Sequence, residues 1–156
     1  MSSSTRAHQR PKAPIIAMLA EVEAASTFLA SLTPKTAPAD ARARFLDALR
    51  GLLLSKFQSH WNVDQPLLGS AYRAIVNSER LVDPLLVRAA AMAGAPELAL
   101  GLPSDLVVWI DPHEVSYRIG EYGSVCTLYD DGFRRRVAFN GLSAQRYPPN
   151  YLVPVN

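Results

Sequence analysis

The apolar run Leu106-Val107-Val108-Trp109-Ile110 is the feature that most restricts how this chain can fold. It is bounded by Ser-Asp before it and Asp-Pro after it, and its length and branched side chains predict a strand covered on both faces. Two further apolar runs follow, at 115–119 and 125–129. The segment between them contains Gly120 and Gly123, which suit the connection of a hairpin. The second half of the chain therefore predicts strands.

Helical spacing of apolar residues dominates the first half. One such pattern begins at Pro14 and should end before Pro34. A second predicted helix is capped by Asp40 and carries its apolar face on Phe45, Leu49, Leu52, Leu53 and Phe57. Asp83-Pro84 is a start signal for a third helix over 85–93, with a further turn at 96–100. Between the second and third helices, the segment 71–76 reads as a short strand.

Helices first and strands later predict an α+β fold, with N-terminal helices packed on a small, mainly antiparallel β-sheet that includes a C-terminal β-hairpin. A length of 156 residues fits one domain. We expect a disordered N-terminal leader at 1–13, the folded domain at 14–129 and a partly ordered C-terminal tail at 130–156. Within the tail, 130–132 predicts a turn and Arg134-Arg135-Arg136 predicts a solvated loop.

Several classes of function are disfavoured by the residues present. Cys126 is the only cysteine, which excludes an intramolecular disulfide and a zinc site of several thiolates. A net charge of +2 argues against general coating of nucleic acid. No apolar run approaches the roughly 20 residues that span a bilayer, and Glu21 and Glu23 interrupt what could be a secretory signal. We therefore expect an intracellular protein with no membrane association, although an organellar leader stays open.

The sequence also encodes no recognisable reaction. His60 and His113 lack metal-ligand spacing, and no Gly-rich phosphate loop or nucleophile elbow is present. We expect no enzyme activity, no metal and no cofactor. What remains is a set of aromatic and acidic residues at the ends of the predicted elements, each of which could belong to the core or to a protein interface: Trp61, Tyr72, Asp83, Trp109, Asp111 and Tyr117.

Two segments carry a resemblance to a known family. His60-Trp61, then Gly69-Ser70-Ala71-Tyr72-Arg73-Ala74-Ile75 and Asp83-Pro84, resemble the first signature box of the BTG/Tob anti-proliferative family. The segment Leu102 to Glu121, with Gly123-Ser124 and Leu128-Tyr129, resembles its second box almost throughout. The resemblance extends over about residues 14–129.

The resemblance implies a BTG domain that acts as a non-enzymatic adaptor in the cytoplasm and nucleus. It would bind the Caf-type deadenylase subunit of the Ccr-Not complex and promote shortening of mRNA poly(A) tails. By motif position, the partner-binding residues would be Tyr72, Asp83, Trp109 and Asp111. The two rings would point outward together as contact anchors, and the two carboxylates would lie near the rim or hold loops.

Other parts of the resemblance are less complete. Asn150-Tyr151 and the apolar residues after them resemble a third box, through which shorter family members engage a poly(A)-binding protein. His113 and Tyr122 stand at variable positions of the pattern, and the loop 63–68 lacks the basic residues common there. The alternative function is a transcriptional co-regulator that binds transcription factors, or a self-associating scaffold, without a deadenylase.

Overall fold

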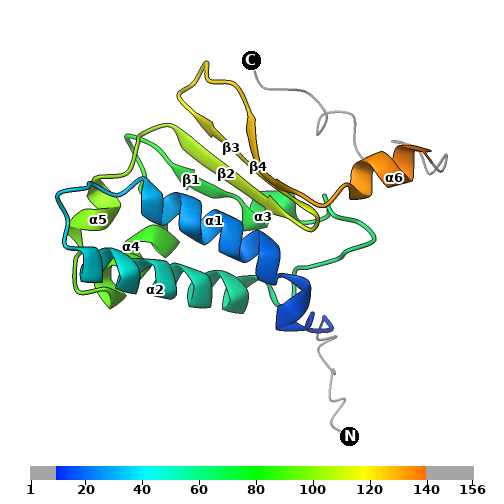
Figure 1. The fold of residues 1–156 in the computed structure, drawn as a ribbon, viewed down its shortest axis with the longest axis horizontal. Coiled ribbons are helices and arrows are strands. Elements are labelled where there is room, and N and C mark those ends of the chain that lie inside the picture. Colours follow the sequence, from blue (N-terminus) through cyan, green and yellow to red (C-terminus); the bar gives the residue numbers. More distant parts are fainter. Residues whose placement is uncertain (1–9, 140–156) are drawn as a thin grey trace, which may run out of the picture.

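The computed structural model describes residues 10–139. Figure 1 shows a layer of helices against one face of a single sheet. The elements are the 3-10 turn η1 (Ile15–Ala17), α1 (Leu19–Ser31), α2 (Ala39–Phe57), α3 (Ser70–Arg73), β1 (Ile75–Asn77), α4 (Pro84–Met92), α5 (Glu97–Leu100), β2 (Leu106–Asp111), β3 (Glu114–Ile119), β4 (Cys126–Asp130) and α6 (Phe133–Phe139).

The sheet has the order β1-β2-β3-β4, and each neighbouring pair is antiparallel. Ile75 pairs with Val108, and Trp109 pairs with Ser116. α1 packs on β2, β3 and β4, whereas α2 packs on α1 and α4. The predicted α+β fold, with helices on one side of an antiparallel sheet, is confirmed.

The core lies between this helical layer and one face of the sheet. Leu106, Val108 and Ile110 of β2 are fully buried there, together with residues such as Leu29 of α1 and Phe45 of α2. Burying a side chain of this size contributes about 1.5–3 kcal/mol to folding. The residues between them in β2 are only half-buried. The expectation that this strand is covered on both faces was therefore wrong, because the helices cover one face of the sheet only.

Two other expectations for regular structure were wrong. The segment 71–76 is not one strand, since α3 occupies Ser70–Arg73 and only Ile75–Asn77 joins the sheet. Gly69, at φ 77°, starts that turn, and the Ala74 N–H donates to the Ser70 carbonyl to close it. Residues 133–139 form α6 rather than a solvated loop, because Asp131 accepts a hydrogen bond from the Phe133 N–H and arginine is a good helix former.

Helix starts were predicted with mixed success. Asp83 caps α4, its Oδ1 accepting from the Leu85 N–H at 2.9 Å, as expected. Asp40 does not cap α2. Pro38 occupies the cap position, and Asp40 lies in the first turn, where it pairs with Arg44 at 3.0 Å.

The last residues of the expected disordered leader contact the domain. The Ala13 N–H donates to the Gln58 carbonyl at 2.7 Å, and Arg10 Nη1 lies 3.3 Å from His60 Nδ1. The rest of the leader, residues 1–9, and the tail beyond 139, including Asn150 and Tyr151, lie outside the described residues. No helix within 10–139 is long and apolar enough to cross a bilayer.

Candidate partner-binding surface

The face of the sheet opposite the helices brings the two signature segments together. Side chains alternate across a strand, so Val107 and Trp109 point away from the core that buries Leu106, Val108 and Ile110. Val76 of β1 pairs with Val107 and shares its face, and Val76 is 44% exposed. We call the face formed by Val76, Val107, Trp109, Ser116 and Arg118 the outer sheet face.

Tyr72 lies close to the end of the β1–β2 ladder that carries Trp109. Tyr72 is on α3, three residues before Ile75. Ile75 pairs with Val108, the residue before Trp109. Its side chain is 46% exposed, and Trp109 is half-buried. Both predicted anchors therefore belong to the same end of the β1–β2 ladder, and neither is enclosed in the core. Their contact with a partner stays a prediction.

Asp111 has a different environment. It is 6% exposed, and its Oδ1 accepts a hydrogen bond of 2.9 Å from Arg73 Nη2. Burial raises the pKa of Asp111, and the positive charge of Arg73 acts against that rise. The carboxylate is committed to the interior of the protein, so it fits the expected role of holding loops and not that of a rim contact.

Arg73 organises the backbone around this pair. Its side chain is fully buried and makes five hydrogen bonds of 2.7–2.9 Å. Besides Asp111, the acceptors are the carbonyl groups of Ile110, His60, Leu68 and Pro66. The guanidinium thereby ties the loop 58–69 to the end of β2. No role was predicted for Arg73, because nothing in the local sequence pattern distinguishes a buried arginine from an exposed one.

Asp83 connects the other edge of the surface to the helical layer. While Oδ1 caps α4, its Oδ2 accepts from the Val76 N–H of β1 at 3.1 Å. β1 is an edge strand of three residues, and this bond satisfies one of its free backbone donors. Asp83 is half-buried, so one carboxylate fixes both α4 and the strand that carries Val76.

A pocket of about 670 Å³ adjoins Tyr72 on the side of the loop 58–69. The ring centroid of His60, which lines the pocket, lies 4.1 Å from that of Tyr72. The Nζ of Lys56 lies 4.8 Å from the same Tyr72 centroid. The lining residues are Arg10, Pro11, Ser59, His60, Trp61, Asn62, Val63, Leu68 and Gly69.

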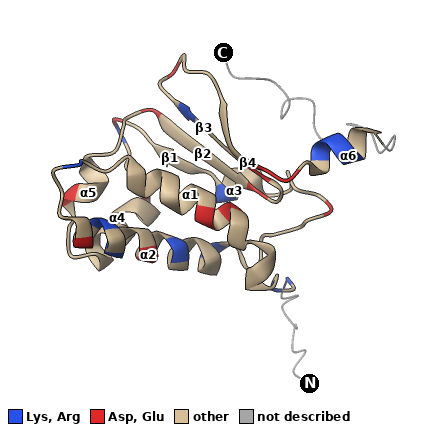
Figure 2. Ribbon diagram, in the orientation of Figure 1, with Lys and Arg blue, Asp and Glu red and all other residues tan. Residues whose placement is uncertain are grey.

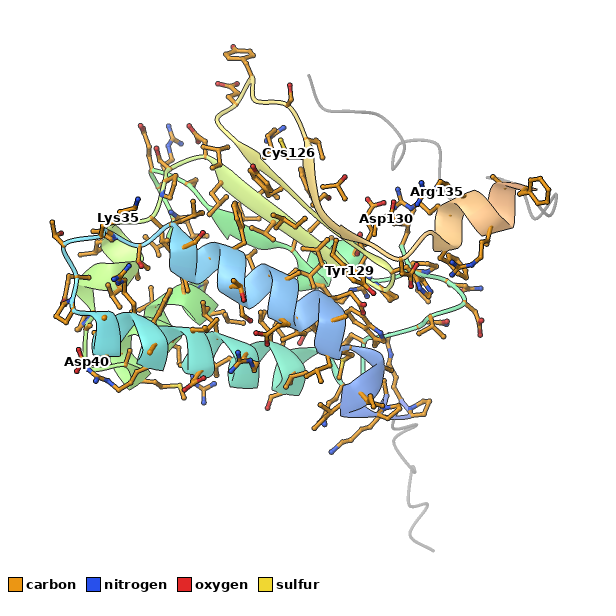
Figure 3. All side chains as sticks on the ribbon, in the orientation of Figure 1. Lys35, Asp40, Cys126, Tyr129, Asp130 and Arg135 are labelled. Atoms are coloured by element: carbon orange, nitrogen blue, oxygen red, sulfur yellow. The ribbon has the colours of Figure 1, made fainter. Side chains whose placement is uncertain are left out.

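The remaining reactive side chains do not meet in one site. His113 Nδ1 lies 2.6 Å from Asp131 Oδ2, and its ring stacks on Phe133, so it anchors α6. Asp130 and Asp131 form an acidic segment, which Figure 2 shows directly before the basic helix α6. Cys126 is exposed on β4 (Figure 3). Among residues 10–139, no group of His, Cys, Asp and Glu could hold a metal ion.

Known proteins resemble this chain in both sequence and fold. The model of the BTG family matches residues 18–129. The chain is 42% identical over 118 residues to human protein BTG2, a match that covers 73% of this chain and 74% of that protein. It is 40% identical over 117 residues to human protein BTG1, covering 72% and 68% of the two chains. It is 38% identical over 116 residues to human protein Tob2, covering 73% of this chain but 33% of Tob2. A solved BTG/Tob domain of FOG-3 from C. elegans shares the fold with a TM-score of 0.65 at 24% identity, covering 81% of this chain and 100% of that domain.

Proposed function

Since the chain belongs to the BTG family, we propose that it is a non-enzymatic adaptor that binds the Caf-type deadenylase subunit of the Ccr-Not complex. Binding would bring the deadenylase to selected transcripts, shorten their poly(A) tails and restrain cell proliferation. The protein would act in the cytoplasm and nucleus, where these transcripts and the complex occur.

The observation that carries this proposal is the meeting of both signature segments on the outer sheet face. Tyr72 comes from the first segment and Trp109 from the second, and the pairing of Val76 with Val107 joins them into one surface. Large aromatic side chains bury much area at small entropic cost, so they are common anchors of protein interfaces. The valines would supply an apolar centre and Arg118 a polar margin, as in typical interfaces.

Calorimetric titration of the purified chain with the deadenylase subunit tests the proposal. Trp109→Ala should weaken binding by at least about 2 kcal/mol, or roughly 30-fold in Kd, as for a central aromatic anchor. Tyr122→Ala is the matched control, since this ring is 84% exposed in the connection between β3 and β4 and lies outside the surface. It should bind as the parent does. Circular dichroism of both variants would establish that the domain stays folded.

Equal affinity of the folded Trp109→Ala variant and the parent would contradict the proposal. Light scattering after size-exclusion chromatography supplies the other arm of the experiment. Concentration-dependent assembly, together with no bound deadenylase in a pull-down, would instead support the self-associating scaffold or the transcriptional co-regulator.

We propose further that Asn150 and Tyr151 contribute to a contact with a poly(A)-binding protein. Replacing both by alanine should weaken capture of that protein and leave deadenylase binding unchanged. If the double variant lost both interactions, the proposal that the two partners bind separate regions of the chain would be wrong.

A further inference from the structure

A row of positively charged or ionisable side chains begins beside Tyr72 and runs into the neighbouring pocket. The Lys56 ammonium lies over the Tyr72 ring, the His60 ring lies against the same ring, and Arg10 Nη1 lies 3.3 Å from His60 Nδ1. The pKa of His60 is lowered by burial and then by the charges of Arg10, Arg73 and Lys56. His60 is therefore mostly neutral near pH 7, and the fixed cations of this surface are Lys56 and Arg10.

These two cations are not neutralised by the part of the chain that the structure describes. Neither Arg10 nor Lys56 has a carboxylate within 4.0 Å among residues 10–139, whereas Arg44 and Arg73 each have one and Arg50 has two. The pocket lining contains no acidic side chain. Asp64, in the same loop, forms no ion pair with a described residue. The surface next to Tyr72 therefore keeps a local positive charge in a protein whose net charge is only +2.

The pocket combines this charge with apolar walls. Leu68 and Val63 are exposed at its rim, and Trp61 forms part of its lining. A short protein segment with an acidic and an apolar side chain matches both features. Nucleic acid fits less well, because binding to its backbone relies on cations that neutralise several phosphates, and the two cations identified at this surface are Arg10 and Lys56.

We infer that the partner covering Tyr72 also inserts an acidic segment into the pocket between Arg10 and the loop 58–69, with its carboxylates facing Arg10 and Lys56. This inference rests on the proposed function, because it extends the same interface from the outer sheet face past Tyr72. Charges at the margin of an interface act mainly on the association rate and on its dependence on salt.

Surface plasmon resonance with the deadenylase subunit at 50 and 300 mM salt tests the inference. The double variant Arg10→Gln/Lys56→Gln should associate about tenfold more slowly than the parent at low salt and should lose most of its salt dependence. Lys35→Gln is the control, since Lys35 lies before α2, at the opposite end of that helix from Lys56 (Figure 3). It should behave as the parent. Parent-like rates and salt dependence in the double variant would overturn the inference while leaving the proposed function standing.

If the parent does not bind the deadenylase, the proposed function fails and the inference needs a test of its own. A labelled peptide of alternating Glu and Leu supplies that test. The inference expects the full chain to bind this peptide, the Gln/Leu version to bind far more weakly, and the double variant to lose binding. No difference between the two peptides would overturn it. Tighter binding of a poly(A) oligonucleotide than of the acidic peptide, lost in the same double variant, would also overturn it and assign the pocket to nucleic acid.

Discussion

Replacing Asp111 with asparagine removes the carboxylate that meets the buried Arg73 guanidinium and leaves that charge without a counter-ion among the described residues. Arg73 is 0% and Asp111 6% exposed, so solvent can compensate little. Removing one partner of a buried ion pair costs about 3–5 kcal/mol. Four carbonyl groups continue to accept hydrogen bonds from Arg73, so we expect a loss at the lower end of this range, about 3 kcal/mol. For a domain of this size the melting temperature should fall by about 10 °C.

Urea unfolding followed by circular dichroism measures this loss. Asp40→Asn is the matched control, because it breaks an exposed ion pair with Arg44 and should leave the unfolding midpoint unchanged. The Asp111→Asn variant should also bind the deadenylase more weakly, in proportion to the loss of order in the loop that Arg73 holds. A variant with the parent's unfolding midpoint and no partner binding would refute this reasoning and make Asp111 a direct contact.

Three further predictions concern other parts of the fold. Burial raises the pKa of Glu21 to about 7, so the stability associated with its neutral form is present below pH 4.5 and lost as the pH rises through about 7. In thermal melts, the folding stability of Glu21→Gln relative to the parent should rise between pH 5 and 8, by at most about 3 kcal/mol. A stability difference that does not change with pH would refute this prediction. Asp83→Ala removes the cap of α4 and a bond to β1, and it should cost about 1–2 kcal/mol in urea unfolding. In Gly123→Ala the new Cβ would clash with the Ile119 carbonyl oxygen, so the variant should lose about 1–3 kcal/mol by the same assay, and parent-like stability would show that the loop relaxes freely.

Much of the fold could be predicted because its signals are local and periodic. The apolar faces of α1 and α2, the cap at Asp83 and the hairpin of β3 and β4 each follow from residues a few positions apart. α3 and α6 could not be predicted in the same way. Arg73 of α3 donates to carbonyl groups of β2 and of the loop 58–69, and α6 is anchored by His113 through Asp131 and Phe133. Such long-range contacts produce no periodic pattern in the amino-acid sequence.

For the candidate surface, the sequence predicted four contact residues whose binding to a partner stays a prediction, and it did not distinguish the roles of the rings from those of the carboxylates. Tyr72 and Trp109 share one end of the β1–β2 ladder, as the outward placement of both rings requires. Asp83 and Asp111 were grouped with them by motif position, but their carboxylates hold a helix start and a buried arginine. Only the three-dimensional environment distinguishes a carboxylate that supports a surface from one that lies on it. The pocket beside His60 also depends on Arg10, which is fifty residues away in sequence.

The antiparallel pairing of β1 with β2 unites residues that lie on either side of α4 and α5 in the chain. A synthetic fragment of either signature segment carries one half of the recognition surface, so neither should compete with the intact protein. Recognition is thereby coupled to the integrity of the whole domain. Separation of β1 from β2, for example by proteolysis between them, would therefore remove both halves of the recognition surface from a molecule at once.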